Sequence, residues 1–143
     1  MHMTRVRDIM TPVVEILQVG DSVDLASRLM NAGRIRHLPV VDGEQRLVGL
    51  ITHRKLLAAW LSHGDPTHER RRDLARETPV EMVMESDVIT TWPDAPVSEV
   101  AGLMEKHKIG CVPVLDDGKV VGIVTEADFV KLARRLFERE ATV

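Results

Sequence analysis

The chain has 143 residues, of which 44% are hydrophobic, and a formal net charge of −3. It lacks the overall basic field on which non-specific nucleic-acid binding depends, so we do not expect a nucleic-acid partner. Its single cysteine, Cys111, permits no internal disulfide and is typical of a reducing compartment. No apolar run approaches the roughly 18 residues that span a bilayer, and no signal-peptide pattern opens the chain. We therefore expect a cytoplasmic protein with no membrane partner.

The first half of the chain predicts a strand, a helix, two strands and a second helix. A lead-in over 6–10 ends at Thr11, because the residue before a proline disfavours helix. Apolar spacing, cap residues and turn residues then predict a strand over 13–19, a helix that follows the Asp21-Ser22 cap and stops at 31–33, strands over 38–41 and 47–51, and a helix over 53–61.

A charged segment over 62–78 separates the two halves. Gly64 and Pro66 interrupt the preceding helix, and the mixed charges over 69–76 are typical of an exposed helical face. The elements predicted after this connector are a lead-in over 80–84, a strand over 88–92, a helix opened by Asp94-Ala95-Pro96, strands over 112–115 and 120–124, and a closing helix over 128–139.

The second half repeats the first. Pro39 recurs as Pro113, 74 positions later (113 − 39 = 74), and Ile35 recurs as Ile109 at the same offset. The offset falls to 73 after the turn that begins at Asp42, where a polar loop tolerates a change of length. Each copy is therefore β-α-β-β-α, and the fold class is α/β. Because a half of about 70 residues would be marginally stable alone, we expect the copies to share a core.

The repeated unit resembles the cystathionine-β-synthase (CBS) motif. Each copy carries the pattern: 35–42 with 47–52 in the first, and 109–116 with 120–125 in the second. The chain resembles a tandem CBS pair, or Bateman module, of the stand-alone bacterial or archaeal type. This implies a first repeat over 6–61, a connector over 62–78 and a second repeat over 79–138. The repeats would pack about a pseudo-twofold axis, leaving two clefts between them.

The resemblance also implies a function. CBS pairs are mostly regulatory rather than enzymatic, and many bind adenosine-containing ligands such as AMP, ADP, ATP or S-adenosylmethionine. We therefore expect an adenine nucleotide as a regulatory ligand, with or without magnesium, and no required cofactor. Ligand occupancy would be signalled to an unidentified protein partner or through a homodimer.

The most specific candidate site lies at Thr125 and Asp128, where a strand gives way to a helix. Thr125 can cap that helix, and the Asp128 carboxylate can accept hydrogen bonds from both hydroxyls of a ribose. The same spacing also fits a helix capping box with no ligand. The resemblance favours the ligand role, because the matching Thr and Asp of the family contact phosphate and ribose.

The first copy departs from this pattern, since Lys55 stands where the second copy has Asp128. A lysine offers three donors and no acceptor, so it cannot accept a hydrogen bond from a ribose hydroxyl. Two alternatives follow: this cleft is empty, or Lys55 binds phosphate together with Arg36 and His37. Arg36 and His37 could also serve a ligand anchored at Asp128.

The resemblance supplies candidate walls for both clefts. The Asp128 cleft would be lined by Thr11, Val14, Ile109 and Cys111. The weaker Lys55 cleft would be lined by Thr52, Ile35, His37, Val88 and Thr90. Ordinary burial in strands would explain most of these side chains equally well.

Other chemistry finds less support in the sequence. His53, His63 and His68 lack the tight spacing of metal ligands, so we expect no metal site. Cys111 and His37 hold matching repeat positions, but no orienting third group accompanies them, so we expect no catalytic residues.

Apolar side chains on the terminal helices predict a homodimer, since a module of this size has few other ways to cover them. The residues concerned are Leu57, Trp60, Leu132 and Leu136. The competing hypothesis is a ligand-free interaction module whose clefts are degenerate, and Lys55 is the residue that favours it.

Overall fold

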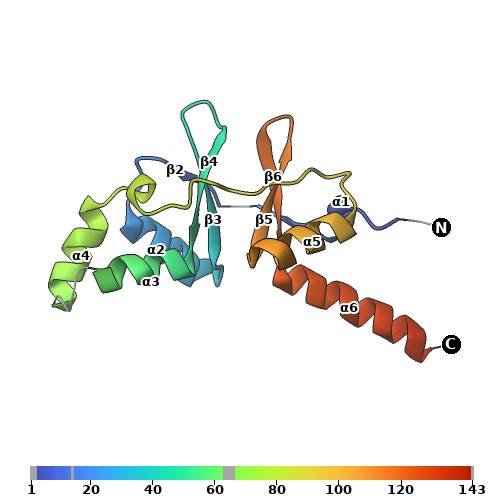
Figure 1. The fold of residues 1–143 in the computed structure, drawn as a ribbon. Coiled ribbons are helices and arrows are strands. Elements are labelled where there is room, and N and C mark those ends of the chain that lie inside the picture. Colours follow the sequence, from blue (N-terminus) through green and yellow to red (C-terminus); the bar gives the residue numbers. More distant parts are fainter. Residues whose placement is uncertain (1–2, 14, 63–66, 143) are drawn as a thin grey trace. The chain divides into compact units, whose positions relative to one another are not determined.

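The computed structural model describes residues 3–13, 15–62 and 67–142, and the chain forms two compact units. Unit 1 comprises Met1–Val13 with Ile89–Val143, and unit 2 comprises Val14–Val88. Each unit therefore contains one repeat's helices and strands together with the first segment of the other repeat, which we call the lead-in: residues 3–13 in unit 1 and 79–88 in unit 2. Figure 1 shows this exchange by colour, because the blue N-terminal segment accompanies the orange and red elements of unit 1.

Unit 2 is a three-stranded sheet with helices packed against it. Strand β2 runs parallel to β3, and β3 runs antiparallel to β4, in the order β2-β3-β4. Ser22 caps the first long helix, since its side chain accepts a hydrogen bond from the backbone N–H of Leu25 at 3.1 Å. The elements are β2 (Leu17–Gln18), α2 (Val23–Gly33), β3 (His37–Val41), β4 (Leu47–Thr52), α3 (His53–Ser62), α4 (His68–Glu77) and the 3-10 turn η1 (Val80–Met82).

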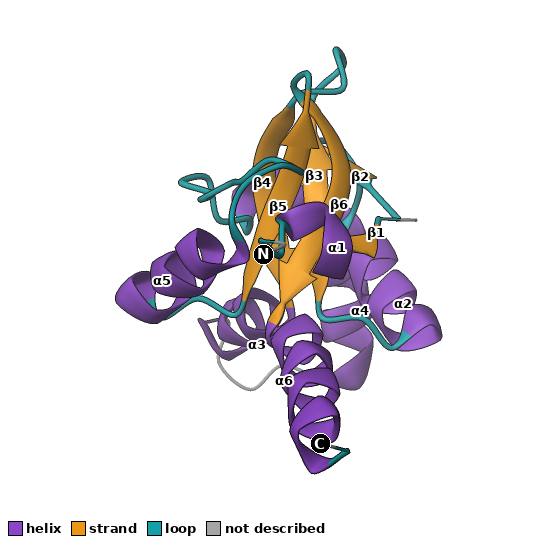
Figure 2. Ribbon diagram, turned by 90° about the vertical axis from the view of Figure 1, so that its right-hand side faces the viewer, coloured by secondary structure: helices purple, strands orange, loops and turns teal. Residues whose placement is uncertain are grey.

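Unit 1 has the strand order β1-β6-β5, with every pair antiparallel. The lead-in thus adds its strand to one side of a hairpin that belongs to the second repeat. Helix α6 continues directly from the end of β6 (Figures 1 and 2). The elements are α1 (Val6–Ile9), β1 (Thr11–Pro12), α5 (Val97–His107), β5 (Cys111–Asp116), β6 (Lys119–Thr125) and α6 (Glu126–Ala141).

Most predicted elements are present, but both first strands are shorter than predicted. The strand expected over 13–19 is reduced to Leu17–Gln18, and Val14 lies outside the described residues. The strand expected over 88–92 does not form; Thr91 alone makes a parallel bridge to Val114. That bridge repeats the Leu17–Val40 pair of unit 2, so the register is conserved although the strand length is not.

The charged connector contains the helix that its mixed charges indicate, and this helix also contacts the core of unit 2. This helix is α4, whose N-terminal cap is Thr67 and whose Ala75 is buried. Helix α4 has few apolar positions, but it packs against α2, and its small Ala75 side chain lies in the core of unit 2. Breaker residues Gly64 and Pro66 lie outside the described part of the chain.

The buried side chains form two clusters, where we expected the halves to share one core. The cluster in unit 2 includes Leu17, Val40 and Ile51, and the cluster in unit 1 includes Val6 and Val124. The lead-in exchange explains how each half supports its own cluster, since Val6 in unit 1 and Val80 in unit 2 come from the exchanged segments and are fully buried.

One glycine in each sheet allows the exchanged lead-in to approach the neighbouring strand closely. A Cβ added to Gly122 would lie 2.8 Å from Met10 Sδ and 3.1 Å from the carbonyl oxygen of Thr11. Gly49 of unit 2 is crowded in the same way by the side chain of Met84 and the carbonyl oxygen of Glu85. The close approach of a second backbone therefore accounts for glycine at both positions.

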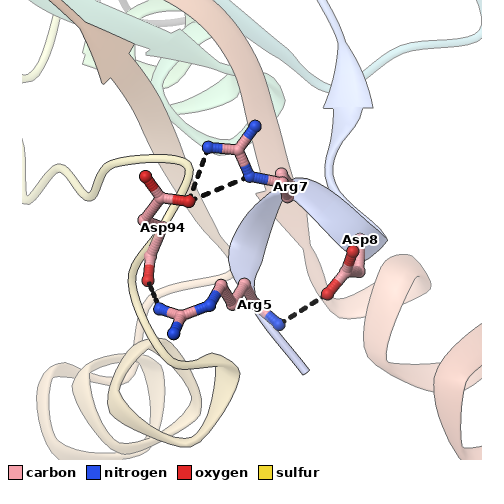
Figure 3. Close-up of polar contacts among 4 residues, drawn as sticks. All are labelled: Arg5, Arg7, Asp8 and Asp94. Atoms are coloured by element: carbon pink, nitrogen blue, oxygen red, sulfur yellow. Dashed lines mark hydrogen bonds and ion pairs between the residues drawn. The ribbon is translucent and has the colours of Figure 1, made fainter. Parts of the chain in front are cut away.

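Side chains at the start of the chain fasten the lead-in to unit 1 (Figure 3). Arg7 Nε donates a hydrogen bond to Asp94 Oδ1 at 3.0 Å, and Arg5 Nη1 donates to the carbonyl oxygen of Asp94. The backbone N–H of Arg7 also donates to the carbonyl oxygen of Pro93 at 2.9 Å. These contacts place α1 beside the loop before α5, immediately upstream of β1.

Among the described residues, no helix combines the length and the apolar character needed to cross a bilayer.

Candidate ligand-binding site

The junction of β6 and α6 holds a buried carboxylate. Thr125 is the N-terminal cap of α6, and its backbone N–H donates to Asp128 Oδ2 at 2.9 Å. The Thr125 hydroxyl lies 3.3 Å from the same oxygen. Asp128 is only 3% exposed, so these hydrogen bonds offset the cost of burying its carboxylate. The capping box that the spacing permits is therefore present.

A third hydrogen bond reaches Asp128 from the exchanged lead-in. Thr11 Oγ1 donates to Asp128 Oδ1 at 2.8 Å, across 117 positions of the sequence. Thr11 is placed there by its pairing with Ile123, because β1 lies beside β6. Thr11 itself is exposed, so the only hydrogen bond to Oδ1 among the described residues comes from a side chain that solvent can reach.

Cys111 and Ile109 complete the part of the predicted site that lies in unit 1. Cys111 is directly opposite Thr125 in the β5–β6 pair, and Ile109 packs against the core of the unit. The Gly110 carbonyl oxygen accepts the backbone N–H of Glu126 at 3.2 Å, which ties the start of β5 to the start of α6. The fold thus brings Thr11, Cys111, Thr125 and Asp128 together around one helix N-terminus.

Cys111 does not offer a reactive thiolate. Burial raises the pKa of the Cys111 thiol to about 12, so the group stays protonated at neutral pH. Among the described residues, no three His, Cys, Asp or Glu side chains form a group that could hold a metal ion.

The equivalent junction in unit 2 carries different chemistry. Thr52 occupies the position of Thr125, and its hydroxyl accepts the backbone N–H of Lys55 at 3.1 Å. Lys55 Nζ pairs with Glu85 Oε2 at 3.3 Å, and the two side chains are 44% and 46% exposed. Glu85 is carried by the lead-in of the second repeat, bridged to Leu50. The sequence indicated Lys55 but missed its partner Glu85.

The remaining predicted site residues are divided between the units. Ile35 packs against the core of unit 2, His37 is opposite Thr52, and the Arg36 carbonyl oxygen accepts the backbone N–H of His53 at 2.9 Å. Val88 is the last residue of unit 2, and Thr90 belongs to unit 1. A role for Arg36 and His37 toward a ligand at Asp128 stays a prediction, and Val14 lies outside the described residues.

The two repeats share one strand register, and in each a threonine precedes the last helix. The comparison with known families also finds two repeats. The family model of the CBS domain matches residues 6–62 and 80–135. The chain belongs to the CBS-domain family. It is a CBS-domain pair, and pairs of this kind are regulatory modules.

Solved structures agree with this assignment. The pair is 39% identical to a candidate acetoin utilization protein (AcuB) from Vibrio cholerae, with a TM-score of 0.81 over 99% of this chain and 98% of that one. It is 34% identical to the CBS-domain pair of protein MJ0100, solved with 5′-methylthioadenosine and S-adenosyl-L-methionine, with a TM-score of 0.74 over 92% and 96% of the chains. It is 28% identical to CBSX2 in complex with AMP, with a TM-score of 0.77 over 92% and 97%.

Curated relatives include much longer proteins. The pair is 34% identical over 130 residues to a homoserine O-acetyltransferase from Methanohalobium evestigatum, covering 90% of this chain but only 24% of that enzyme. The CBS pair thus corresponds to about a quarter of that relative.

Proposed function

We propose that this CBS pair binds an adenosine-containing ligand, such as AMP, ADP, ATP or S-adenosylmethionine, at the junction formed by Thr11, Thr125 and Asp128. The buried carboxylate of Asp128, placed at a helix N-terminus, is the observation that carries the proposal. Relatives solved with AMP and with S-adenosyl-L-methionine support this class of ligand.

Asp128 has the capacity that a ribose requires. A carboxylate offers roughly four acceptor positions, and the described residues use three of them. One acceptor position of the carboxylate is therefore open for a ribose hydroxyl. The second ribose hydroxyl would take the position on Oδ1 that the Thr11 hydroxyl now occupies. Thr11 is exposed, so its hydroxyl can turn to water when it is replaced. The hydrogen bonds from Thr125 would stay in place and hold the carboxylate for both ribose hydroxyls.

Occupancy of Asp128 would be signalled through the lead-in segment. Thr11 belongs to residues 3–13, so a ligand that competes for Oδ1 changes how β1 is held. A ligand shifts such an equilibrium by the difference in its affinity for the two states. The recipient would be a partner protein or a second copy of the chain.

Helix α6 supports the proposal of a homodimer. Val130, Leu136 and Phe137 are 68%, 48% and 66% exposed. The sequence had placed Leu132 in the same exposed set, but it packs against the core of unit 1. In unit 2, Leu57 is 49% exposed, and the Trp60 side chain lies outside the described residues. Light scattering tests the dimer: a 16.0 kDa particle at high concentration would contradict it.

A thermal-shift screen with AMP, ADP, ATP and S-adenosylmethionine tests the binding proposal, each with and without magnesium. A ligand at about 100 times its Kd adds roughly 2.7 kcal/mol to the free energy of unfolding, which raises Tm by roughly 5–10 °C. Asp128→Ala should abolish the shift. Glu126→Ala is the matched control, because it removes the same charge from an exposed side chain in the same helical turn and should keep the shift.

The second candidate function is a ligand-free interaction module. Its supporting observation is that Asp128 already has three hydrogen-bond donors within the chain, as a purely structural capping box would. No thermal shift with any of the four ligands, together with a lower Tm for Asp128→Ala, would favour this function over the first.

A further inference from the structure

Two substitutions between the repeats are coupled in space. Glu85 matches Thr11 in the repeat (85 − 11 = 74), and Lys55 matches Asp128 (128 − 55 = 73). In unit 1, the lead-in residue Thr11 contacts the helix residue Asp128; in unit 2, the lead-in residue Glu85 contacts the helix residue Lys55. The sheets also agree in register, since Thr11 is opposite Ile123 and Glu85 is opposite Leu50 (123 − 50 = 73). Both residues of this contact therefore differ between the two repeats.

Lysine in place of aspartate removes from the helix the hydrogen-bond acceptor that a ribose diol needs. A ribose diol donates hydrogen bonds, and the Lys55 ammonium has only donors. The carboxylate in this junction belongs to Glu85, and it forms an ion pair with Lys55 at 3.3 Å. A nucleoside that took the carboxylate would have to separate the two charges and leave the ammonium without its partner, a state that costs free energy once ligand excludes water.

We propose that Lys55 and Glu85 are specificity-determining residues that exclude adenosine-containing ligands from the first-repeat junction, so that each chain binds one such ligand, at Asp128. This inference rests on the proposed function, in which Asp128 receives the ribose. A threonine precedes the helix in both units, but its hydrogen bonds differ: the Thr52 hydroxyl accepts the backbone N–H of Lys55, whereas the Thr125 backbone N–H donates to Asp128 Oδ2. The residues at positions 55 and 85, which leave no free carboxylate for a ribose, are thus what distinguishes this junction from the one at Asp128.

Isothermal titration calorimetry of the full chain with AMP and with S-adenosylmethionine tests the stoichiometry. The unaltered protein should bind one ligand per chain. The double variant Lys55→Asp with Glu85→Thr copies the unit 1 pair into unit 2 and should bind two. The neutral control, Lys55→Met with Glu85→Gln, removes the charges without copying the Thr–Asp pair and should still bind one.

The reciprocal variant keeps the test decisive if the first one folds poorly. Thr11→Glu with Asp128→Lys copies the ion pair into unit 1, where the same pair is compatible with the fold at the equivalent register of unit 2. This variant should lose binding while its unfolding transition by circular dichroism stays cooperative. Retained binding in a folded reciprocal variant would overturn both this inference and the binding role of Asp128, whereas the stoichiometry of the Lys55→Asp, Glu85→Thr variant tests the inference alone.

The outcomes separate this inference from the proposed function. Two ligands per unaltered chain, or no second ligand in the folded Lys55→Asp, Glu85→Thr variant, would overturn the role of Lys55 and Glu85 while leaving Asp128 as a binding residue. No binding by the unaltered chain would overturn the proposed function. In that case the gain of one ligand by the same double variant would still support exclusion by Lys55 and Glu85, and no gain would overturn it.

Discussion

Thr11 Oγ1 donates a hydrogen bond to Asp128 Oδ1 at 2.8 Å, and at the equivalent position of the other unit Glu85 forms an ion pair with Lys55. In each unit the lead-in is therefore joined by a side-chain contact to the helix that follows the hairpin, α6 in unit 1 and α3 in unit 2, but the chemistry of that contact differs. In unit 1 the contact leaves a carboxylate with acceptor capacity, and in unit 2 it pairs two opposite charges.

Thr11→Val should lower the free energy of unfolding by about 1–3 kcal/mol. The substitution keeps the side-chain size but removes the donor to Asp128 Oδ1, which is buried and has no other partner among the described residues. Urea unfolding monitored by circular dichroism measures the change. Thr90→Val is the matched control, since the Thr90 hydroxyl makes no hydrogen bond within the described chain. Equal effects of the two substitutions would contradict a structural role for the Thr11 hydroxyl.

Gly122→Ala should destabilise the protein by about 1–3 kcal/mol, because the new Cβ would press on Met10 Sδ and on the Thr11 carbonyl oxygen. Gly102→Ala is the control on helix α5, where no atom lies within 4 Å of the added Cβ, and it should stabilise by about 0.5–1 kcal/mol. Opposite shifts in Tm are expected. A Gly122→Ala protein as stable as the unaltered one would show that β1 does not lie against β6 as described.

Cys111 should react slowly with a thiol reagent in the folded protein at about pH 8 and rapidly once unfolded in urea, because burial raises its pKa to about 12. The absorbance of the released chromophore with a disulfide reagent measures the rate. Fast labelling of the folded chain would contradict the burial.

The raised pKa of Cys111 also predicts that the protein loses stability at high pH. The folded pKa lies above that of an unfolded cysteine, about 8.5, so the unfolded chain loses its proton first as the pH rises. The contribution of Cys111 is therefore intact below about pH 8.5 and is lost progressively as the pH rises toward 12. Urea unfolding at several pH values should show a steeper alkaline decline for the unaltered protein than for Cys111→Ala. Parallel declines would rule out this contribution.

The ion pair between Arg7 and Asp94 should contribute little. Both side chains are largely exposed, at 53% and 64%, so we expect a coupling free energy of about 0.2–1 kcal/mol that falls with added salt. A double-mutant cycle of Arg7→Ala and Asp94→Ala at low and high salt measures it. The Arg7 backbone N–H still donates to Pro93 in these variants, so the lead-in should remain docked. A coupling much larger than this range would mean that the lead-in depends on this pair.

The internal repeat allowed most elements to be predicted from the sequence. Helix α2 begins after Ser22 as its cap pattern indicates, and β3 and β4 flank the turn at Asp42 as the apolar runs indicate. These features depend on residues close together in the chain, so local patterns suffice to find them. Thr125 and Asp128 are three positions apart, and their capping contact is local in the same sense.

Contacts between distant segments were decided by the tertiary structure. The strand predicted over 88–92 is reduced to one bridge at Thr91, because strand length depends on the neighbour that supplies hydrogen bonds. The exchange of lead-ins leaves no local signal, since apolar spacing does not specify which sheet edge a segment joins. Glu85 could have been found from its 74-residue offset to Thr11, but its significance depends on its contact with Lys55. The sequence by itself determined the two repeats, their helix caps and the family. Only the tertiary structure decided which distant residues meet, because the Asp128 carboxylate receives the Thr11 hydrogen bond from a segment that folding brings to it.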